Sequence, residues 1–375
     1  MKLNEPLARV ALTSALAAVL VIILVAGLWP FNPLPPNNVE WLKDKNGLRL
    51  GKNPIVVSRS PFRFTDMGWS SVSLEIWVDP VHVGPANTFF SIYTPENPSQ
   101  FRLMQYRNIL LVKRNAKDER GHWHEAAIGV DNAVYPNVSL FITLTGGAKG
   151  TSIYLNGKLA RYFPDCLLSG GDVSGQLIFG TSPFERRTWQ GEWRALAFYG
   201  RELRPNEILA HYQKWTEGGQ AELVKESPTP MVYDFRQGSG ALIHDLGGTG
   251  PDLLIPIHYS VPHKPILQRP WEEYRPNLTY AADLAVNIAG FVPLGFLLSA
   301  FLWSSAHCNR PILTTIIVGG LISISIEILQ AFIPSRSSGM TDIITNTSGT
   351  ALGSLLIVQP AVKRWLARLS IAKVS

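Results

Sequence analysis

Cysteine and charge are both scarce in this sequence, and their scarcity excludes several kinds of site. The two cysteines, Cys166 and Cys308, form no Cys-x-x-Cys pair and no cluster with histidines. This spacing indicates neither a zinc site nor a redox pair, so we expect no metal centre and no cofactor. Charged residues make up 17% of the chain, and both signs are mixed in its middle part. Without a basic stripe, the net charge of +6 does not indicate a nucleic-acid partner.

Apolar residues are concentrated towards the two ends of the chain. Residues 10–29 form a run of about 20 predominantly apolar residues without a charge, which is long enough to cross a bilayer. A cleaved signal peptide is the alternative, but its apolar core would be shorter, and Gly27-Leu-Trp-Pro30 is a poor cleavage site. We therefore predict a first membrane-spanning helix at residues 10–29, after a short segment of residues 1–9.

Three more spanning helices are predicted near the C-terminus, at about residues 283–303, 311–333 and 342–362. Together they form a membrane module of residues 283–362, which a basic tail of residues 363–375 follows. Gly349-Thr-Ala-Leu-Gly353 matches the small-residue pattern of closely packed helices, which we attribute to packing within one bundle. The sequence leaves the oligomeric state open.

The basic residues that flank these helices predict how the chain crosses the membrane. With four spans, most of them fall on one side: Lys2, Arg9, Arg310, Lys363, Arg364, Arg368 and Lys373. Arg336 falls in the short loop on the other side. Because positively charged flanks favour the cytoplasm, we expect both termini there and residues of about 31–280 outside.

The middle of the chain, residues 37–260, consists of short alternating runs separated by turn residues. Ser71–Val78 places every second apolar side chain on one face, which is the pattern of a half-buried strand. Asn156-Gly157 between strand-like residues predicts a hairpin, and a short helix is expected at residues 205–215 after its opening proline. Many short strands with regular turns predict a two-sheet β-sandwich, which a linker of residues 261–282 follows.

Three segments of this sandwich resemble the laminin-G-like, concanavalin A-like jelly roll. They are Ser73-Leu-Glu-Ile-Trp77, Ile153-Tyr-Leu-Asn-Gly157 and the run from Leu177 to Leu209 with its Trp189-Gln-Gly-Glu-Trp193 core. The resemblance implies a domain that binds glycans or proteins, or one that only packs against a neighbouring domain, and it leaves calcium in the sandwich open. Trp123 and Trp189 are the candidates for stacking on sugar rings, the alternative being that they belong to the core or its rim.

An enzymatic site is not evident in the sandwich. Glycosidases need two carboxylates that flank the scissile bond, and no alternating acidic motif supplies them. His122 and His124 lie on one face of a strand, but no third metal ligand accompanies them.

The membrane module contains ionisable and amide side chains, which are costly in hydrocarbon and therefore indicate a site. Glu327 and Gln330 share one helical face, as do Asp342 and Asn346. On the predicted topology they lie with Asp283 and Asn287 in the outer part of three helices. Arg336 is the expected counter-charge for Glu327 or Asp342. The alternative is that these groups only satisfy one another and fix helix packing.

Three motifs of this module resemble the VanZ-like family: Asn287 to Leu298, Ser325 to Arg336, and Thr341 to Gly349. Trp29-Pro30-Phe31 fits the end of that family's first span, so the sandwich is interpreted as an insertion between the first and second spans. The resemblance implies a multi-pass protein of the bacterial cytoplasmic membrane, in a family whose named member is associated with resistance to the lipoglycopeptide teicoplanin. The matching positions are Asn287, Pro293, Gly295, Glu327, Gln330, Arg336, Asp342, Asn346 and Gly349.

These observations predict a multi-domain membrane protein with four transmembrane helices and an extracytoplasmic concanavalin A-like jelly roll. The leading hypothesis is a non-catalytic envelope protein that binds a lipid-linked glycan or lipoglycopeptide at the outer leaflet. The alternative is a membrane enzyme that acts on a lipid-linked envelope substrate, with Glu327 or Asp342 as general base and Arg336 on a phosphate. A transporter is less favoured, because four spans without internal repeats fall short of that architecture.

Overall fold

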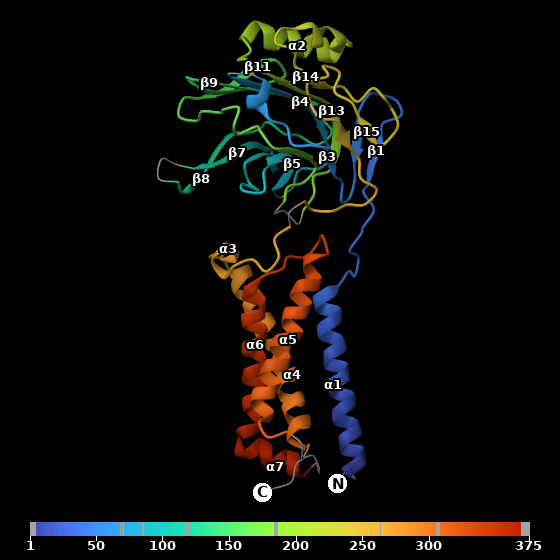
Figure 1. Cartoon of the computed structure of the whole chain (residues 1–375), viewed down its shortest axis with the longest axis vertical. Coiled ribbons are helices and arrows are strands. Elements are labelled where there is room, and N and C mark those ends of the chain that lie inside the picture. Colours follow the sequence, from blue (N-terminus) through green and yellow to red (C-terminus); the bar gives the residue numbers. More distant parts are fainter. Residues whose placement is uncertain are drawn as a thin grey trace. The chain divides into compact units, whose positions relative to one another are not determined.

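The computed structural model describes residues 5–67, 69, 71–84, 86–117, 121–183, 187–262, 264–304 and 308–368. The chain forms two compact units (Figure 1). The β unit comprises Leu34–Lys264, and the helical unit comprises Met1–Pro33 with Pro265–Ser375. Lys2 and Lys373, two of the flanking basic residues, lie outside the described residues.

The β unit is an all-β sandwich of two antiparallel sheets, which confirms the predicted two-sheet architecture. The first sheet has the order β1 (Val39–Trp41), β2 (Leu48–Leu50), β13 (Gly191–Tyr199), β4 (Val72–Pro80), β9 (Leu140–Gly147), β10 (Gly150–Leu155) and β11 (Lys158–Phe163), with β14 (Met231–Tyr233) also on β13. The second has the order β15 (Leu242–Ile243), β16 (Leu253–Leu254), β3 (Val56–Ser58), β12 (Gln176–Phe179), β5 (Asn87–Tyr93), β6 (Phe101–Tyr106), β7 (Ile109–Lys117) and β8 (Trp123–Val130). A 3₁₀ helix, η1 (Phe64–Met67), precedes β4.

The core lies between the two sheets, and the alternation in β4 explains how it forms. Val72, Leu74, Ile76 and Val78 are buried in this core, as the two-residue period of a strand predicts. The predicted hairpin is also present: Leu155 pairs with Lys158, and Asn156 and Gly157 have φ of 51° and 78°. Two positive φ values in a two-residue loop are typical of the type I′ turn.

Helix α2 (Pro205–Glu217) covers the outer face of the first sheet (Figure 1). It begins with a proline, the Glu207 carboxylate accepts a 2.8 Å hydrogen bond from the Arg204 backbone N–H, and Gly218 ends it with φ 88°. Ile208, His211 and Trp215 face the sheet, and the 3₁₀ helix η2 (Gln220–Lys225) follows. The helix predicted from Pro205 is therefore confirmed, and β4 is buried on both faces.

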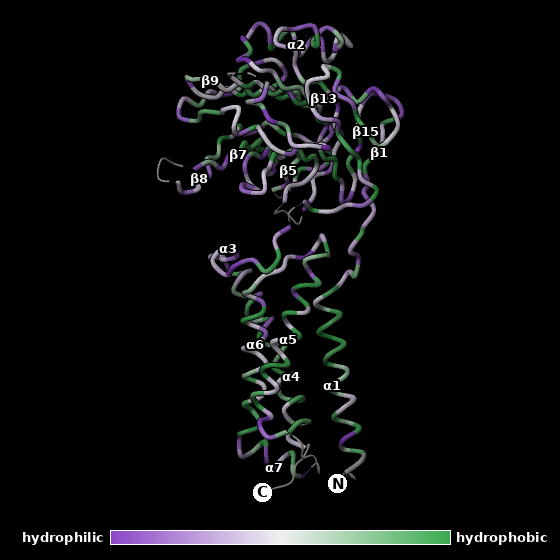
Figure 2. The backbone as a smooth tube through the Cα atoms, viewed as in Figure 1, coloured by the Kyte–Doolittle hydropathy of each residue, from purple (hydrophilic) through white to green (hydrophobic). Residues whose placement is uncertain are grey.

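The helical unit contains three helices that are long and apolar enough to cross a membrane. They are α1 (Glu5–Leu28), α4 (Leu278–Ser304) and α5 (Pro311–Ala331). Most of their residues are hydrophobic, as the colouring of Figure 2 shows. The unit also contains α3 (Pro270–Glu273), α6 (Met340–Leu355), the 3₁₀ helix η3 (Leu356–Val358) and α7 (Pro360–Arg368).

The fourth predicted span, residues 342–362, is not one continuous helix. Helix α6 has 16 residues, which corresponds to roughly 24 Å and is shorter than the roughly 30 Å hydrocarbon core of a bilayer. Pro360 begins α7, because proline cannot continue a helix in which its N–H is needed. The structure therefore supports three spans by length and composition, and the fourth remains a proposal.

Candidate functional site

Helices α4 and α6 pack backbone against backbone, and glycine makes this approach possible. A Cβ atom added to Gly349 would lie 2.1 Å from the carbonyl oxygen of Ile288. A Cβ added to Gly353 would lie 2.0 Å from the Val292 carbonyl oxygen, and one added to Gly295 would lie 2.1 Å from that of Thr350. The two glycines of the Gly-x-x-x-Gly motif therefore allow close packing within the bundle, as small residues do in closely packed membrane helices.

Glu327 is the most deeply buried carboxylate of the helical unit's motif residues, with 1% of its surface exposed. Its Oε2 atom accepts a 2.8 Å hydrogen bond from the Gly339 backbone N–H, at the residue that precedes α6. A carboxylate at this position satisfies an N–H that the helix leaves unpaired and interacts favourably with the helix dipole. Glu327 therefore joins the C-terminal half of α5 to the start of α6.

Two more motif residues of α6 hold the neighbouring helices. Asn287 in α4 donates a 2.7 Å hydrogen bond from Nδ2 to Asp342 Oδ1. Asn346 donates a 3.0 Å bond from Nδ2 to Ser323 Oγ in α5. The polar side chains of α4, α5 and α6 thus meet in pairs, as their spacing predicted.

Glu273, in the segment predicted as a linker, also belongs to this site. Its Oε2 atom accepts a 3.0 Å hydrogen bond from the Thr341 N–H in the first turn of α6. A Cβ on Gly339 would come within 1.7 Å of Glu273 Oε1, so a larger residue there would displace the Glu273 carboxylate. The signal that could have revealed it is the acidic pair Glu272-Glu273 after Arg269-Pro270, because such a pair opens a short helix beside the first membrane residues. We call Glu273, Glu327 and Asp342 the carboxylate cluster.

Arg336 binds the C-terminal end of α1, and its role as counter-charge for Glu327 or Asp342 stays a prediction. Its Nε donates a 2.9 Å hydrogen bond to the Trp29 carbonyl, and its Nη2 donates to the Ala26 carbonyl. Gln330 Nε2 donates 2.8 Å to the Gly27 carbonyl. These acceptors form the C-terminal end of α1, where unpaired carbonyls attract a cation.

Two predicted site residues do not join the carboxylate cluster. Asp283 and Pro293 lie on the exposed side of α4. The cluster itself combines three carboxylates, an amide and the N–H groups of a helix start. Carboxylate oxygens accept hydrogen bonds, so this arrangement suits hydroxyl or ammonium groups. Among the residues that the structure describes, no group of three or more His, Cys, Asp or Glu residues is placed to hold a metal ion.

In the β unit, the structure separates the two tryptophans proposed for sugar stacking. Trp189 is 2% exposed, packs 5.8 Å from the Phe89 ring, and donates a 2.8 Å hydrogen bond to Gln105 Oε1. A buried indole cannot stack on a sugar, so Trp189 belongs to the core, which was the alternative to a sugar-binding role. Trp123 at the start of edge strand β8 is 47% exposed, with Lys117 Nζ 5.0 Å from its ring centre.

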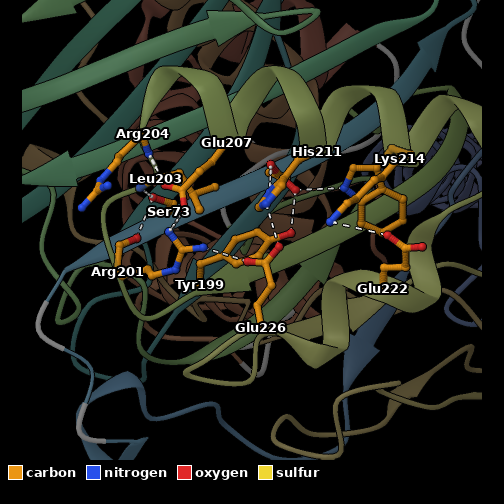
Figure 3. A network of polar contacts seen from close by, with 12 residues as sticks. Ser73, Tyr199, Arg201, Leu203, Arg204, Glu207, His211, Lys214, Glu222 and Glu226 are labelled. Atoms are coloured by element: carbon orange, nitrogen blue, oxygen red, sulfur yellow. Dashed lines mark hydrogen bonds and ion pairs between the residues drawn. The ribbon is translucent and has the colours of Figure 1, made fainter.

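A buried network of charges fixes α2 to β4 (Figure 3). Glu75 is fully buried, and its carboxylate accepts hydrogen bonds from Tyr199 (2.8 Å) and Trp215 (2.9 Å) and lies 3.0 Å from His211 Nδ1. His211 Nε2 lies 2.8 Å from Glu226, which also binds Arg201 at 2.8 Å. Both imidazole nitrogens therefore face carboxylates, as in a protonated histidine.

These contacts make the stability of the β unit depend on pH. Burial lowers the pKa of His211, but hydrogen bonds and charges from Glu226 and Glu75 outweigh it and raise this pKa from 6.5 to about 9. The stabilisation is fully present below pH 6.5 and is lost as the pH rises through 9. Burial raises the pKa of Glu226, but His211 and Arg201 hold it below 4.5. Its contribution is present above pH 4.5 and is lost on acidification.

We expect the β unit to be most stable between about pH 4.5 and 6.5 and to lose about 3 kcal/mol as the pH rises from 6.5 to about 9. This value follows from the difference between 6.5 and about 9, at about 1.4 kcal/mol for each pH unit. Urea unfolding of the full chain, followed by tryptophan fluorescence at several pH values, measures it. His211→Gln should flatten this dependence, whereas the exposed His244→Gln should retain it. An unchanged slope in His211→Gln would contradict the assignment.

Residues 244–363 match the family model described as VanZ/LLP1. The match starts in the β unit and ends in α7, so it includes every residue of the carboxylate cluster. It confirms the VanZ-like resemblance predicted from the three motifs. No curated protein matches the sequence.

Among solved structures, similarity is weak. The binding domain of botulinum neurotoxin DC in complex with rat synaptotagmin II has 18% identity and a TM-score of 0.38, covering 48% of this chain and 46% of that one. The CBM40 of a Ruminococcus gnavus sialidase, bound to α2,3-sialyllactose, has 14% identity and a TM-score of 0.35, covering 45% of this chain and 97% of that one. The chain thus spans less than half the length of the neurotoxin domain.

Scores this low carry no argument about the fold family or ligand of the β unit, so its laminin-G-like character stays a prediction. For the helical unit, the apolar helices and the family match both indicate a membrane module. The chain is a membrane protein that combines an all-β sandwich with a module matching the VanZ/LLP1 family at residues 244–363.

Proposed function

We propose that the helical unit binds an amphiphilic glycan, either lipid-linked or a lipoglycopeptide, without catalysing a reaction on it. The observation that supports this is the carboxylate cluster, in which three acidic groups surround the start of α6. Intramembrane carboxylates are expensive and mark ligand sites by default. Their accepting oxygens suit sugar hydroxyls or the ammonium groups of a glycopeptide.

The β unit would contribute the glycan contact outside the membrane. Trp123 presents a half-exposed indole on an edge strand, and its ring already lies beside the Lys117 ammonium. Aromatic faces of this kind bind the apolar faces of sugars while polar neighbours bind hydroxyls. We propose that the sandwich is a concanavalin A-like jelly roll on the outer side of a bacterial cytoplasmic membrane. The bundle would cross that membrane four times, with both termini inside.

An enzyme that acts on a lipid-linked phosphate is less well supported. Arg336, the cation that would hold the phosphate, donates to two carbonyls of the α1 end. Glu327, the candidate base, is 1% exposed and already accepts a backbone hydrogen bond.

The test is binding of a fluorescent lipoglycopeptide and of a fluorescent undecaprenyl-linked disaccharide to the full chain in lipid nanodiscs. We expect Asp342→Asn to weaken binding roughly tenfold to hundredfold, the value of one hydrogen bond to a charged group. Trp123→Ala should weaken it severalfold. Asp283→Asn is the matched control, since it makes the same change on the exposed side of α4 and should bind normally.

Either of two results would overturn the proposal. One is that the unaltered chain binds neither ligand. The other is that Asp283→Asn weakens binding as much as Asp342→Asn, because charge alone would then explain the effect.

A further inference from the structure

The bundle has a second feature, a groove at the opposite end of α5 from the carboxylate cluster. The groove has a volume of about 620 Å³, within the roughly 300–1,000 Å³ of small-molecule sites. Its lining comes from the end of α4, the link and the start of α5: Trp303, Cys308, Arg310, Pro311, Ile312, Leu313 and Ile316. Ile316 precedes Glu327 by 11 residues, or roughly 16 Å of helix, so the two sites are distinct.

The walls of the groove are apolar and its rim is basic. Ile312, Leu313 and Ile316 form one side, while Arg310 is the cation among the lining residues. Leu313 and Ile317 on the same helix are about half exposed, so the apolar wall continues onto the outer surface of a spanning helix. A ligand with an anionic head and a hydrocarbon tail would match both parts.

Helix α7 supplies a second cation. Its Leu366 is buried with Leu12, Ala300 and Ile357, and Trp303 packs against this cluster. Lys363, three residues before Leu366, holds its Nζ 5.0 Å from the centre of the Trp303 ring. Figure 1 shows α7 across the end of the bundle where α1 begins. The packing of Leu366 therefore sets a lysine beside a wall of the groove.

We propose that this groove binds an anionic phospholipid of the surrounding bilayer. Arg310 and Lys363 would bind the headgroup phosphate, and an acyl chain would lie along Ile312, Leu313 and Ile316. Basic pockets between membrane helices are suited to anionic headgroups, and Trp303 in the last turn of α4 has the amphipathic ring that is favoured at membrane interfaces. A free phosphate would leave the apolar wall unused, so the bilayer lipid is the occupant that fits both halves of the groove.

The decisive experiment titrates phosphatidylglycerol and phosphatidylcholine into the purified full chain in detergent, with bound lipid counted by native mass spectrometry. We expect preference for phosphatidylglycerol. The double variant R310Q/K363Q should lower this affinity roughly 30-fold, because each basic residue near an anionic headgroup contributes a factor of about five. R364Q/R368Q removes the same charge from exposed positions of α7 outside the groove and should change the affinity much less.

Three outcomes would overturn the proposal. The two double variants could weaken binding equally, phosphatidylcholine could bind as tightly as phosphatidylglycerol, or millimolar inorganic phosphate could displace the lipid. The last result would identify a phosphate site instead. All three concern the basic end of the bundle, so they leave the proposed role of the carboxylate cluster untouched.

A second experiment tests the same proposal without substituting any residue of the groove. Cys308 is a partly buried lining residue, and in a Cys166→Ser chain it is the remaining thiol. Phosphatidylglycerol should slow its modification by N-ethylmaleimide at least severalfold, whereas phosphatidylcholine should not. An unchanged rate at saturating phosphatidylglycerol would place the lipid elsewhere.

Discussion

Replacing Gly349 by valine is expected to abolish the native packing of α4 against α6. Even the first carbon of a new side chain would lie 2.1 Å from the Ile288 carbonyl oxygen, and that oxygen belongs to the helix backbone. Overpacking a core with side-chain neighbours costs roughly 1–3 kcal/mol, because rotamers can adjust. Here a whole helix must move, so we expect a larger loss, with the hydrogen bond between Asn287 and Asp342 broken as well.

Thermal unfolding of the detergent-purified chain, with size-exclusion chromatography, measures this loss. Gly290→Val is the control, because a Cβ added to Gly290 in α4 meets no atom within 4 Å. Gly349→Val should fail to give a monodisperse protein or should melt far below the unaltered chain. Equal behaviour of the two variants would show that glycine is not needed for the approach of α4 and α6.

Replacing Glu75 by alanine should destabilise the β unit by about 3–5 kcal/mol, as removal of one partner from a buried ion pair does. The change leaves the His211 imidazolium and the Tyr199 and Trp215 donors without their shared acceptor. Urea unfolding at pH 6 should therefore shift to much lower denaturant. Glu217→Ala removes an exposed carboxylate of α2 and should be nearly neutral. A neutral Glu75→Ala would mean that apolar packing alone holds α2.

The features of the sandwich that could be predicted are those that residues close together in the sequence determine. The alternation of Val72, Leu74, Ile76 and Val78 identifies one buried face, and Asn156-Gly157 identifies a turn, because each depends on the period of a strand or on two φ angles. Glu75 shows the limit of that reading. Strand alternation puts it on the outward face, and only α2, whose His211 is 136 residues away, makes that face a buried one.

The candidate site shows the same limit. The helical spacing correctly directed Asn287, Glu327, Asp342 and Asn346 towards neighbouring helices. Charge complementarity suggests a carboxylate partner for Arg336, whereas the carbonyls at the end of α1 that accept its hydrogen bonds lie more than 300 residues away in sequence. The sequence left two roles open for Trp189, because its partner Gln105 is 84 residues distant. Pairing with distant backbone and side-chain groups is what local patterns do not encode.

The hydrogen bonds from Gln330 and Arg336 to the end of α1 also limit the order in which the chain can fold during its synthesis. Helix α1 ends at Leu28 and α4 begins at Leu278, so about 250 residues are synthesised between the two. At roughly 5–20 residues per second, translation of this interval takes roughly 10 to 50 seconds. The carbonyls of Ala26, Gly27 and Trp29 acquire these donors only after α5 has been made. The β unit is therefore complete, and has time to fold, before the bundle can close around its first helix.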